Sequence, residues 1–201
     1  LANARLQNHR CLGLKPIAAG AEYHDGQAFS DDAARLARGA GFSGPLSEIN
    51  PYLFEAPIAP HVAAQQQGVR ITAQQVAHWA RQQARGYSHV LLEGAGGWRV
   101  PLNEDELFSD IGIQLGWPVV LVVGMRLGCI SHALLTAEAI RADGLFIAGW
   151  IANRIDPQQA AYDENRETLK KRLAAPFLGQ VDHADSTVEQ VADQLMWPAN
   201  A

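Results

Sequence analysis

The chain has 201 residues, 48% of them hydrophobic, which is typical of a single domain with one sizeable core. A formal net charge of −5 without any basic run argues against a nucleic-acid-binding protein, because phosphate contacts need clustered Lys and Arg. Two cysteines, Cys11 and Cys129, are too few for a disulfide framework or a zinc site and fit a reduced cytoplasm. The longest apolar runs, such as residues 118–123, are far shorter than the roughly 20 residues of a membrane span. We expect a cytoplasmic protein without a membrane segment.

Residues 12–17 form the first strand-like run of the sequence. The strand is predicted to stop at Pro16, because proline lacks the N–H that an interior strand donates. Lys15 therefore lies at a strand end. Residues 1–9 before it resemble the tail of a helix, and a polar loop is expected after it, up to Gly26.

The next predicted element is a helix ending at Ala40, in which Ser30 is the cap and Asp31 and Asp32 occupy the first turn. Residues 41–61 follow and carry four prolines among aromatic residues. This composition favours a long ordered loop over a site.

The central stretch of the chain is residues 88–97, a buried apolar strand that ends in Glu93 and a glycine-rich turn. A capping box, Thr72 with Gln75, predicts the helix before it, which ends at Gly86. Ligands of open α/β sheets bind beyond the carboxyl ends of the strands, so an acid there could hold Mg²⁺ and the glycines could admit a phosphate. The same pattern is typical of a strand whose acid caps the next helix, and the residues alone leave both interpretations open.

The second half of the chain alternates regularly between helix and strand. Helices are expected over residues 106–115, 130–142 and 158–173, strands over 118–124, 145–153 and 176–181, and a last helix after a capping box of Ser186 and Glu189. Such alternation predicts βαβ units. The fold class is therefore α/β, a doubly wound and mostly parallel sheet with helices on both faces, in one domain over residues 1–201.

Several candidate residues have a structural interpretation beside the functional one. Lys15 alone would be a solvated surface lysine, and Asp31 alone a partner of the helix dipole. Both are predicted close to Glu93, where a cation could neutralise a reacting anion and two carboxylates could share a divalent metal. Asn153 ends a strand and could form a turn or contact an adenine edge. The seven histidines show no metal-ligand spacing.

The chain resembles the dethiobiotin synthetase family in segments that span nearly its whole length in the right order. These segments are residues 15–20 (KPIAAG), 30–31 (SD), 50–52 (NPY), 60–61 (PH), 93–98 (EGAGGW), 122–124 (VVG), 127–130 (LGCI) and 149–153 (GWIAN). The resemblance implies a P-loop NTPase-like fold and an ATP- and Mg²⁺-dependent ligase. In that family 7,8-diaminononanoate reacts with CO₂ to a carbamate, the carbamate attacks the γ-phosphate of ATP, and the second amine closes the ring.

The resemblance also implies a role for particular residues. Lys15 is the catalytic lysine, and Asp31 and Glu93 are the Mg²⁺ carboxylates. Nucleotide contacts are expected from Asp31, Glu93, Gly94, Ala95, Gly96, Asn153, Arg154, Asp182, His183 and Ala184. Substrate contacts are expected from Ala19, Pro60, Gly97, Gly128, Cys129, Ile130 and Ser131. The turn over residues 128–131 would reach the site from the second subunit of a homodimer.

The chain departs from the family pattern in three places. Ala19 replaces a common serine and Ser131 a usual asparagine, and both changes would touch substrate. The strand and P-loop, G-x-x-x-x-G-K-[ST], with which the family begins are not in this sequence. We therefore expect an N-terminally shortened chain whose 201 residues alone do not turn over ATP. Alternatives are a cobyrinate-amidase-like or partitioning-type ATPase, or an inactive remnant that only binds ligand.

Overall fold

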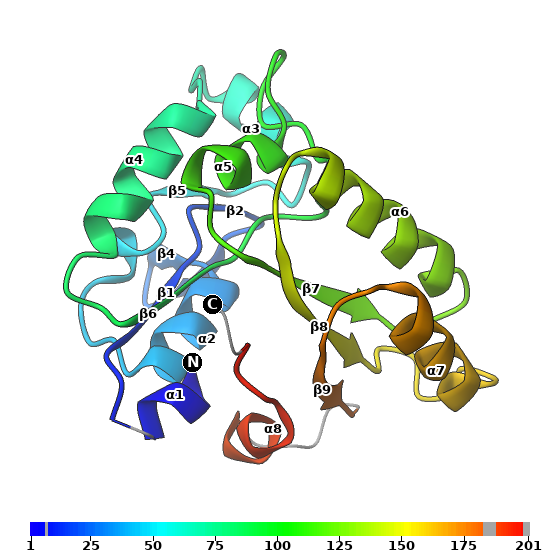
Figure 1. Ribbon diagram of the computed structural model, residues 1–201. Coiled ribbons are helices and arrows are strands. Elements are labelled where there is room, and N and C mark those ends of the chain that lie inside the picture. The colour runs from blue at the N-terminus through cyan, green and yellow to red at the C-terminus, as the bar shows by residue number, and fades with distance from the viewer. Residues whose placement is uncertain (7, 183–187, 199–201) are drawn as a thin grey trace. The chain divides into compact units, whose positions relative to one another are not determined.

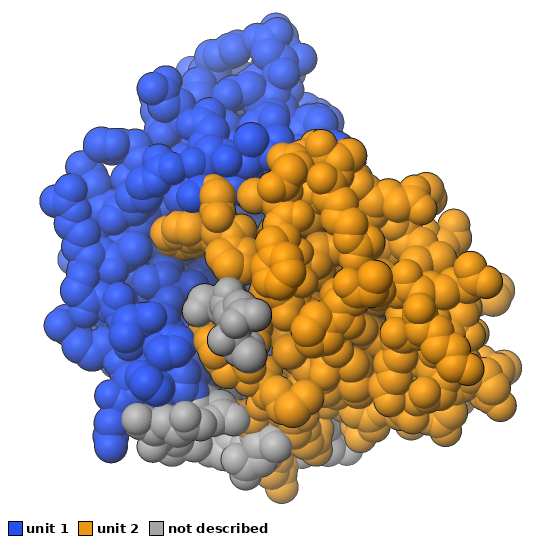
Figure 2. Space-filling model, in the orientation of Figure 1, with its two compact units in different colours: residues 1–115 blue, residues 116–201 orange. Residues whose placement is uncertain are grey.

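The computed structural model describes residues 1–6, 8–182 and 188–198. The chain folds as two compact units, residues 1–115 and residues 116–201, which Figure 2 colours separately. The expected single domain over residues 1–201 stays a prediction.

Unit 1 holds most of the short strands (Figure 1). Its elements are α1 (Ala2–Leu6), β1 (Cys11–Leu14), β2 (Ile17–Ala19), β3 (Glu22–His24), β4 (Gln27–Phe29), α2 (Asp31–Ala40), the 3-10 helix η1 (Leu46–Glu48), β5 (Tyr52–Phe54), α3 (Pro60–Gln66), α4 (Ala73–Gln83), β6 (His89–Leu92) and α5 (Phe108–Leu115).

Two parallel strand pairs organise unit 1. β1 pairs with β6, and β2 pairs with β5. β1 is buried along its whole length, and α2 packs on it. A Cβ at Gly13 would lie 2.8 Å from the Cβ of Leu36 on α2, so glycine permits this close approach. The strand predicted over residues 12–17 is therefore two strands, because the chain changes partner at Lys15 and Pro16.

The polar loop expected before Gly26 is wrong, since β3 and β4 form an antiparallel hairpin there. Its turn is Asp25-Gly26, with φ of 49° and 78°, the left-handed pair that two-residue hairpin turns require. Tyr23 on β3 donates its hydroxyl to Glu55 at 2.7 Å, and this bond raises the pKa of the Tyr23 hydroxyl. The hairpin is thereby tied to the segment that follows β5.

Both capped helix starts predicted in unit 1 are confirmed, whereas the helix expected from residue 106 begins at Phe108. The Ser30 hydroxyl accepts a hydrogen bond from Ala33 N at 3.3 Å at the start of α2. The capping box of α4 has both its bonds, Gln75 N to Thr72 Oγ1 at 3.3 Å and Thr72 N to Gln75 Oε1 at 3.1 Å. Local sequence determined these helix ends because each cap uses groups only three residues apart. The expected long loop over residues 41–61 is instead broken by η1, β5 and the start of α3.

Unit 2 is built on one parallel sheet in the order β7-β8-β9, with α6 packed on β7 and β8, and α7 packed on α6 (Figure 1). Its elements are β7 (Val119–Gly124), α6 (Cys129–Ala142), β8 (Ile147–Asn153), α7 (Tyr162–Arg172), β9 (Phe177–Val181) and α8 (Val188–Gln194). The predicted alternation is thus confirmed, whereas Ser186 of the last capping box lies outside the described residues. None of the described helices is long and apolar enough to cross a bilayer.

Candidate functional site

The strand register of unit 1 brings Lys15 and Glu93 together. Leu14 pairs with Leu92 at the end of the parallel ladder, so the next residue on each strand is Lys15 and Glu93. Glu93 N donates to Leu14 O at 2.8 Å and extends the ladder by one bond. The Lys15 ammonium then meets Glu93 Oε1 at 2.7 Å. The sequence predicted both residues at strand ends, and the register makes them neighbours.

The Lys15 ammonium is buried and contacts three oxygen atoms, two of them through hydrogen bonds. The residue is only 4% exposed. Its Nζ contacts Glu93 Oε1 at 2.7 Å, Asp32 Oδ2 at 2.8 Å and Gly94 O at 3.1 Å. An ammonium group has three protons to donate, and a buried charge requires such partners. Lys15 is therefore not the solvated surface lysine that its position alone allowed.

A cavity of about 570 Å³ opens beside this ammonium group. Six of its lining residues were predicted for the site from the sequence: Lys15, Ala19, Asp31, Pro60, Ala95 and Gly96. Gly20 also lines the cavity with φ of 84°, and a Cβ there would lie 3.1 Å from the Cβ of Pro57 on the facing wall. A side chain at residue 20 would be strained and crowded, so glycine shapes this cavity.

Two neighbouring aspartates at the start of α2 have different partners. Asp31, the predicted metal ligand, lines the cavity and pairs with Arg35 Nε at 2.7 Å. Asp32 reaches Lys15 Nζ, and sequence analysis placed it only in the first helical turn. Both carboxylates lie where the helix dipole favours negative charge. The contact of Asp32 was not predicted, because either of two adjacent acids at a helix start can face the strand on which the helix packs.

The carboxylates around Lys15 also decide whether a metal can be held. No group of three or more His, Cys, Asp or Glu side chains is preformed in the described part of the chain. Asp31, Asp32 and Glu93 nevertheless supply oxygen donors at one edge of unit 1. Mg²⁺ is commonly held by one or two carboxylates together with substrate phosphates and water, so this donor set fits it.

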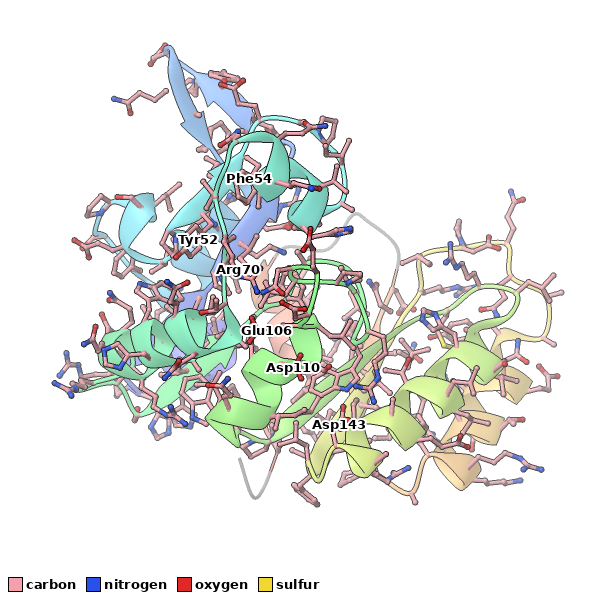
Figure 3. The ribbon with its side chains drawn as sticks, turned by 90° about the horizontal axis from the view of Figure 1, so that it is seen from above. Tyr52, Phe54, Arg70, Glu106, Asp110 and Asp143 are labelled. Atoms are coloured by element: carbon pink, nitrogen blue, oxygen red, sulfur yellow. The ribbon has the colours of Figure 1, made fainter. Side chains whose placement is uncertain are left out.

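The turn after Glu93 is held in place by its downstream segment. Gly96 has φ of 76° and packs against Val100, and both line the cavity. Further on, Glu106 accepts from Ala73 N at 3.3 Å and from Asn103 Nδ2 at 2.6 Å, which ties the segment to the start of α4. Figure 3 labels Glu106 beside α5. The predicted Gly97 lies between Gly96 and Val100 in this turn.

In unit 2, the predicted substrate turn begins α6. Gly128 is the N-cap with φ of 90° and no side-chain cap, and Cys129 starts the helix. Ser131 lies in its first turn and is exposed, whereas Ile130 is half-buried. Leu127 just before the turn is 97% exposed. The turn therefore presents Gly128, Ser131 and the apolar side chain of Leu127 on the surface.

The predicted base-binding residues follow the strands β8 and β9. Asn153 ends β8, and its carbonyl accepts from Met125 N at 2.7 Å and Ile155 N at 2.9 Å. The Arg154 guanidinium lies 4.7 Å from the ring centroid of Tyr162, a cation–π contact. Burial raises the pKa of the Tyr162 hydroxyl. Asp182 follows β9 and accepts from Gln180 Nε2 at 3.3 Å, while His183 and Ala184 lie outside the described residues.

The comparisons first define the class of protein. A family model described as an AAA domain matches residues 1–191. Among solved structures, a ParA family ATPase from Chlorobium tepidum has a TM-score of 0.53 at 15% identity, over 96% of this chain and 78% of that one. This likeness shows the fold alone. The chain is an α/β protein of the P-loop NTPase-like class, as the sequence predicted.

Sequence relatives narrow the class to one family. A protein of Aromatoleum aromaticum is 48% identical over 97% of this chain and 87% of its own length. A Cellvibrio japonicus protein is 46% identical (90% and 79%), and one from Chromohalobacter salexigens 43% identical (100% and 91%). All three are named ATP-dependent dethiobiotin synthetase. The chain belongs to the dethiobiotin synthetase family, a family of ATP-dependent ligases.

Proposed function

We propose that the protein closes the ureido ring of dethiobiotin from 7,8-diaminononanoate, CO₂ and ATP. The observation that carries the proposal is the buried Lys15 ammonium at the cavity, held between Asp32 and Glu93. A fixed cation at a cavity wall suits a reaction in which anionic oxygens develop and are transferred. Family membership supplies the substrates.

The proposed chemistry has three steps. One amine of the substrate attacks CO₂ and loses a proton, which gives a carbamate. A carbamate oxygen then attacks the γ-phosphorus of ATP, the bond to the β-phosphate oxygen breaks, and ADP leaves. The second amine attacks the carbamoyl carbon, the ring closes and phosphate departs. Lys15 stabilises the negative oxygens in the first two steps from a fixed position, so little reorganisation is needed.

Mg²⁺ fits the carboxylates of this site, and we propose that Asp31 and Glu93 hold it, with Asp32 as a further candidate. When bound, it would neutralise charge on the phosphate oxygens of ATP. The protein's own task is to keep these carboxylates at one edge. Strand β6 does this for Glu93 and the first turn of α2 does it for the aspartates.

The remaining predicted residues keep the roles that the family suggests. For the nucleotide these are Gly94, Ala95, Gly96, Asn153, Arg154, Asp182, His183 and Ala184, and for the substrate Ala19, Pro60 and Gly97. Ala19, Pro60, Ala95 and Gly96 line the cavity, which supports their part of the proposal.

We further propose a cytoplasmic homodimer in which the turn of Gly128, Cys129, Ile130 and Ser131 serves the partner's site. The exposed Leu127 and Leu135, at 97% and 63%, support an apolar contact beside this turn. The start of α6, with Gly128 as its N-cap, suits a carboxylate of the substrate. The molar mass in solution tests the dimer.

The experiment that tests the function is Lys15→Met in the full-length protein, with dethiobiotin formation and phosphate release measured together. We expect a loss of about 10²–10³-fold or more, because a preorganised charge at the reacting oxygens is removed. Lys171→Met, at an exposed lysine of α7, is the control and should keep normal turnover. ATP hydrolysis that needs no diamine and survives Lys15→Met would refute the proposal and favour the partitioning-type ATPase.

A further inference from the structure

We propose that Asn50 is a positioning residue for Lys15. Its side-chain Nδ2 donates to the backbone carbonyl of Lys15 at 2.6 Å. Asn50 itself is only 6% exposed. The kinetic test of this inference rests on the proposed function, whereas a second test, the chemical modification of Lys15, rests on the geometry alone.

The backbone at Lys15 is a junction between two strand pairs. Up to Leu14 the chain pairs with β6, and from Ile17 it pairs with β5. Lys15 N donates to Ile49 O at 2.9 Å, and Pro16 has no N–H to give. Neither β5 nor β6 therefore donates a backbone hydrogen bond to the Lys15 carbonyl. The Asn50 amide supplies the missing donor, as a buried carbonyl requires.

The chemistry of the amide explains why this position holds asparagine. The same Nδ2 also approaches Tyr52 O at 3.3 Å, so one NH₂ group joins the end of β1 to the start of β5. A carboxylate of equal size has no proton to donate, and a shorter side chain would not reach. The two peptide groups that flank the Lys15 Cα atom are thereby both fixed, one through Ile49 O and the other through the Asn50 amide.

The consequence lies in the position of the ammonium group. Lys15 is long and flexible, and it must keep contact with Asp32, Glu93 and Gly94 O while facing the cavity. Asn50 is not among the described residues that line the cavity. Its loss should therefore change the placement of the catalytic charge and leave the walls that bind substrate in place.

The first readout is the split between kcat and KM in Asn50→Ala and Asn50→Asp. We expect kcat to fall roughly 10- to 100-fold, since small misplacement of a catalytic group has effects of this size, while KM for diamine and ATP changes little. Ser88→Ala is the matched control, because the exposed Ser88 Oγ donates to the backbone carbonyl of Arg10 at 3.1 Å, at the opposite end of the β1 and β6 pair. It should keep its kcat within about twofold of wild type.

The second readout needs no turnover. Acetylation of Lys15 by acetic anhydride, relative to the exposed Lys171, is followed by mass spectrometry on folded protein. We expect Lys15 to be modified faster in the Asn50 variants than in wild type and in Ser88→Ala. If Asn50→Ala does not fold, Asn50→Ser is measured, and melting temperatures accompany every variant.

The outcomes separate the two proposals. Unchanged kcat with unchanged Lys15 acetylation would overturn the positioning role, as would an equal loss in Ser88→Ala. A rise in KM alone would also overturn it, since that would make Asn50 a binding residue. If the full-length wild-type protein forms no dethiobiotin, the proposed function fails, and the acetylation ratio still decides whether Asn50 holds Lys15.

Discussion

The carboxyl ends of the parallel strands differ between the two units. In unit 1, β1 and β6 are followed by Lys15 and Glu93, which form an ion pair. In unit 2, β7 and β8 end at Gly124 and Asn153, and Arg154, which follows β8, lies on the Tyr162 ring and has no carboxylate partner among the described residues. The same kind of sheet edge thus yields a charged site or an aromatic one, according to the residue just past each strand.

This difference predicts different sensitivities. Coulombic contacts at a buried ammonium group depend on each charge, so a neutral isostere in unit 1 should affect turnover strongly. A guanidinium over an aromatic ring loses a smaller contact energy when the ring is removed. Substitutions in unit 1 should therefore act on kcat, and those in unit 2 on the affinity for nucleotide.

The largest effect is expected for Glu93→Gln. Turnover should fall at least about 10²-fold, because several kcal/mol of charge stabilisation would be lost. The melting temperature should shift by about 4 °C or less, since Glu93 serves a ligand more than the core. Activity and thermal melting are measured on the same preparation, with Glu104→Gln, an exposed acid, as control. Near-normal turnover, or a protein that fails to fold, would make Glu93 structural.

An intermediate effect should distinguish Asp31 from Asp32. Asp31→Asn should raise the Mg²⁺ concentration for half-maximal activity at least about tenfold, as the loss of metal-site groups does. Asp32→Asn should leave that concentration unchanged and lower kcat about two- to fivefold, because water around the exposed Asp32 carboxylate screens its pairing with Lys15 to roughly 1 kcal/mol or less. Asp32 is 56% exposed, which calls for this small estimate. Magnesium titrations of turnover decide, and the reverse pattern would exchange the two assignments.

The smallest effect is expected in unit 2, for Tyr162→Leu. Removing the ring beneath Arg154 should raise KM for ATP about two- to fivefold, the range of an exposed to partly buried cation–π contact. Tyr162→Phe keeps the ring and is the matched control. The buried Tyr162 hydroxyl has no hydrogen-bond partner within the described residues, so this variant should be at least as stable as wild type. Equal KM values for the two variants would remove Arg154 from the nucleotide site.

The sequence predicted the elements whose signals are local. Ser30, Thr72 and Gln75 marked helix starts through bonds that span three residues, and the regular alternation after Gly86 predicted parallel strands. The hairpin over residues 22–29 was missed although Asp25-Gly26 is a strong turn signal, because its flanking residues are polar and largely exposed.

The site was predictable in its residue types and not in its partners. Strand ends indicated Lys15 and Glu93, but the contact of Lys15 with Asp32 depends on how α2 packs on β1. Asn50 was visible only as part of a family segment, and its bond to the Lys15 carbonyl depends on where β5 begins. Such contacts join residues far apart in the chain, and periodicity carries no information about them.

The parallel register of β1 and β6 also governs where this chain can tolerate changes in length. Lys15 and Glu93 are 78 residues apart, yet they meet because Leu14 and Leu92 close the ladder together. One residue inserted within either strand would turn the following side chain to the opposite face and separate the pair. Insertions at the exposed Gly68 between α3 and α4 would leave that register intact. Engineering of this protein can therefore lengthen its loops freely, but must preserve the residue count within these two strands.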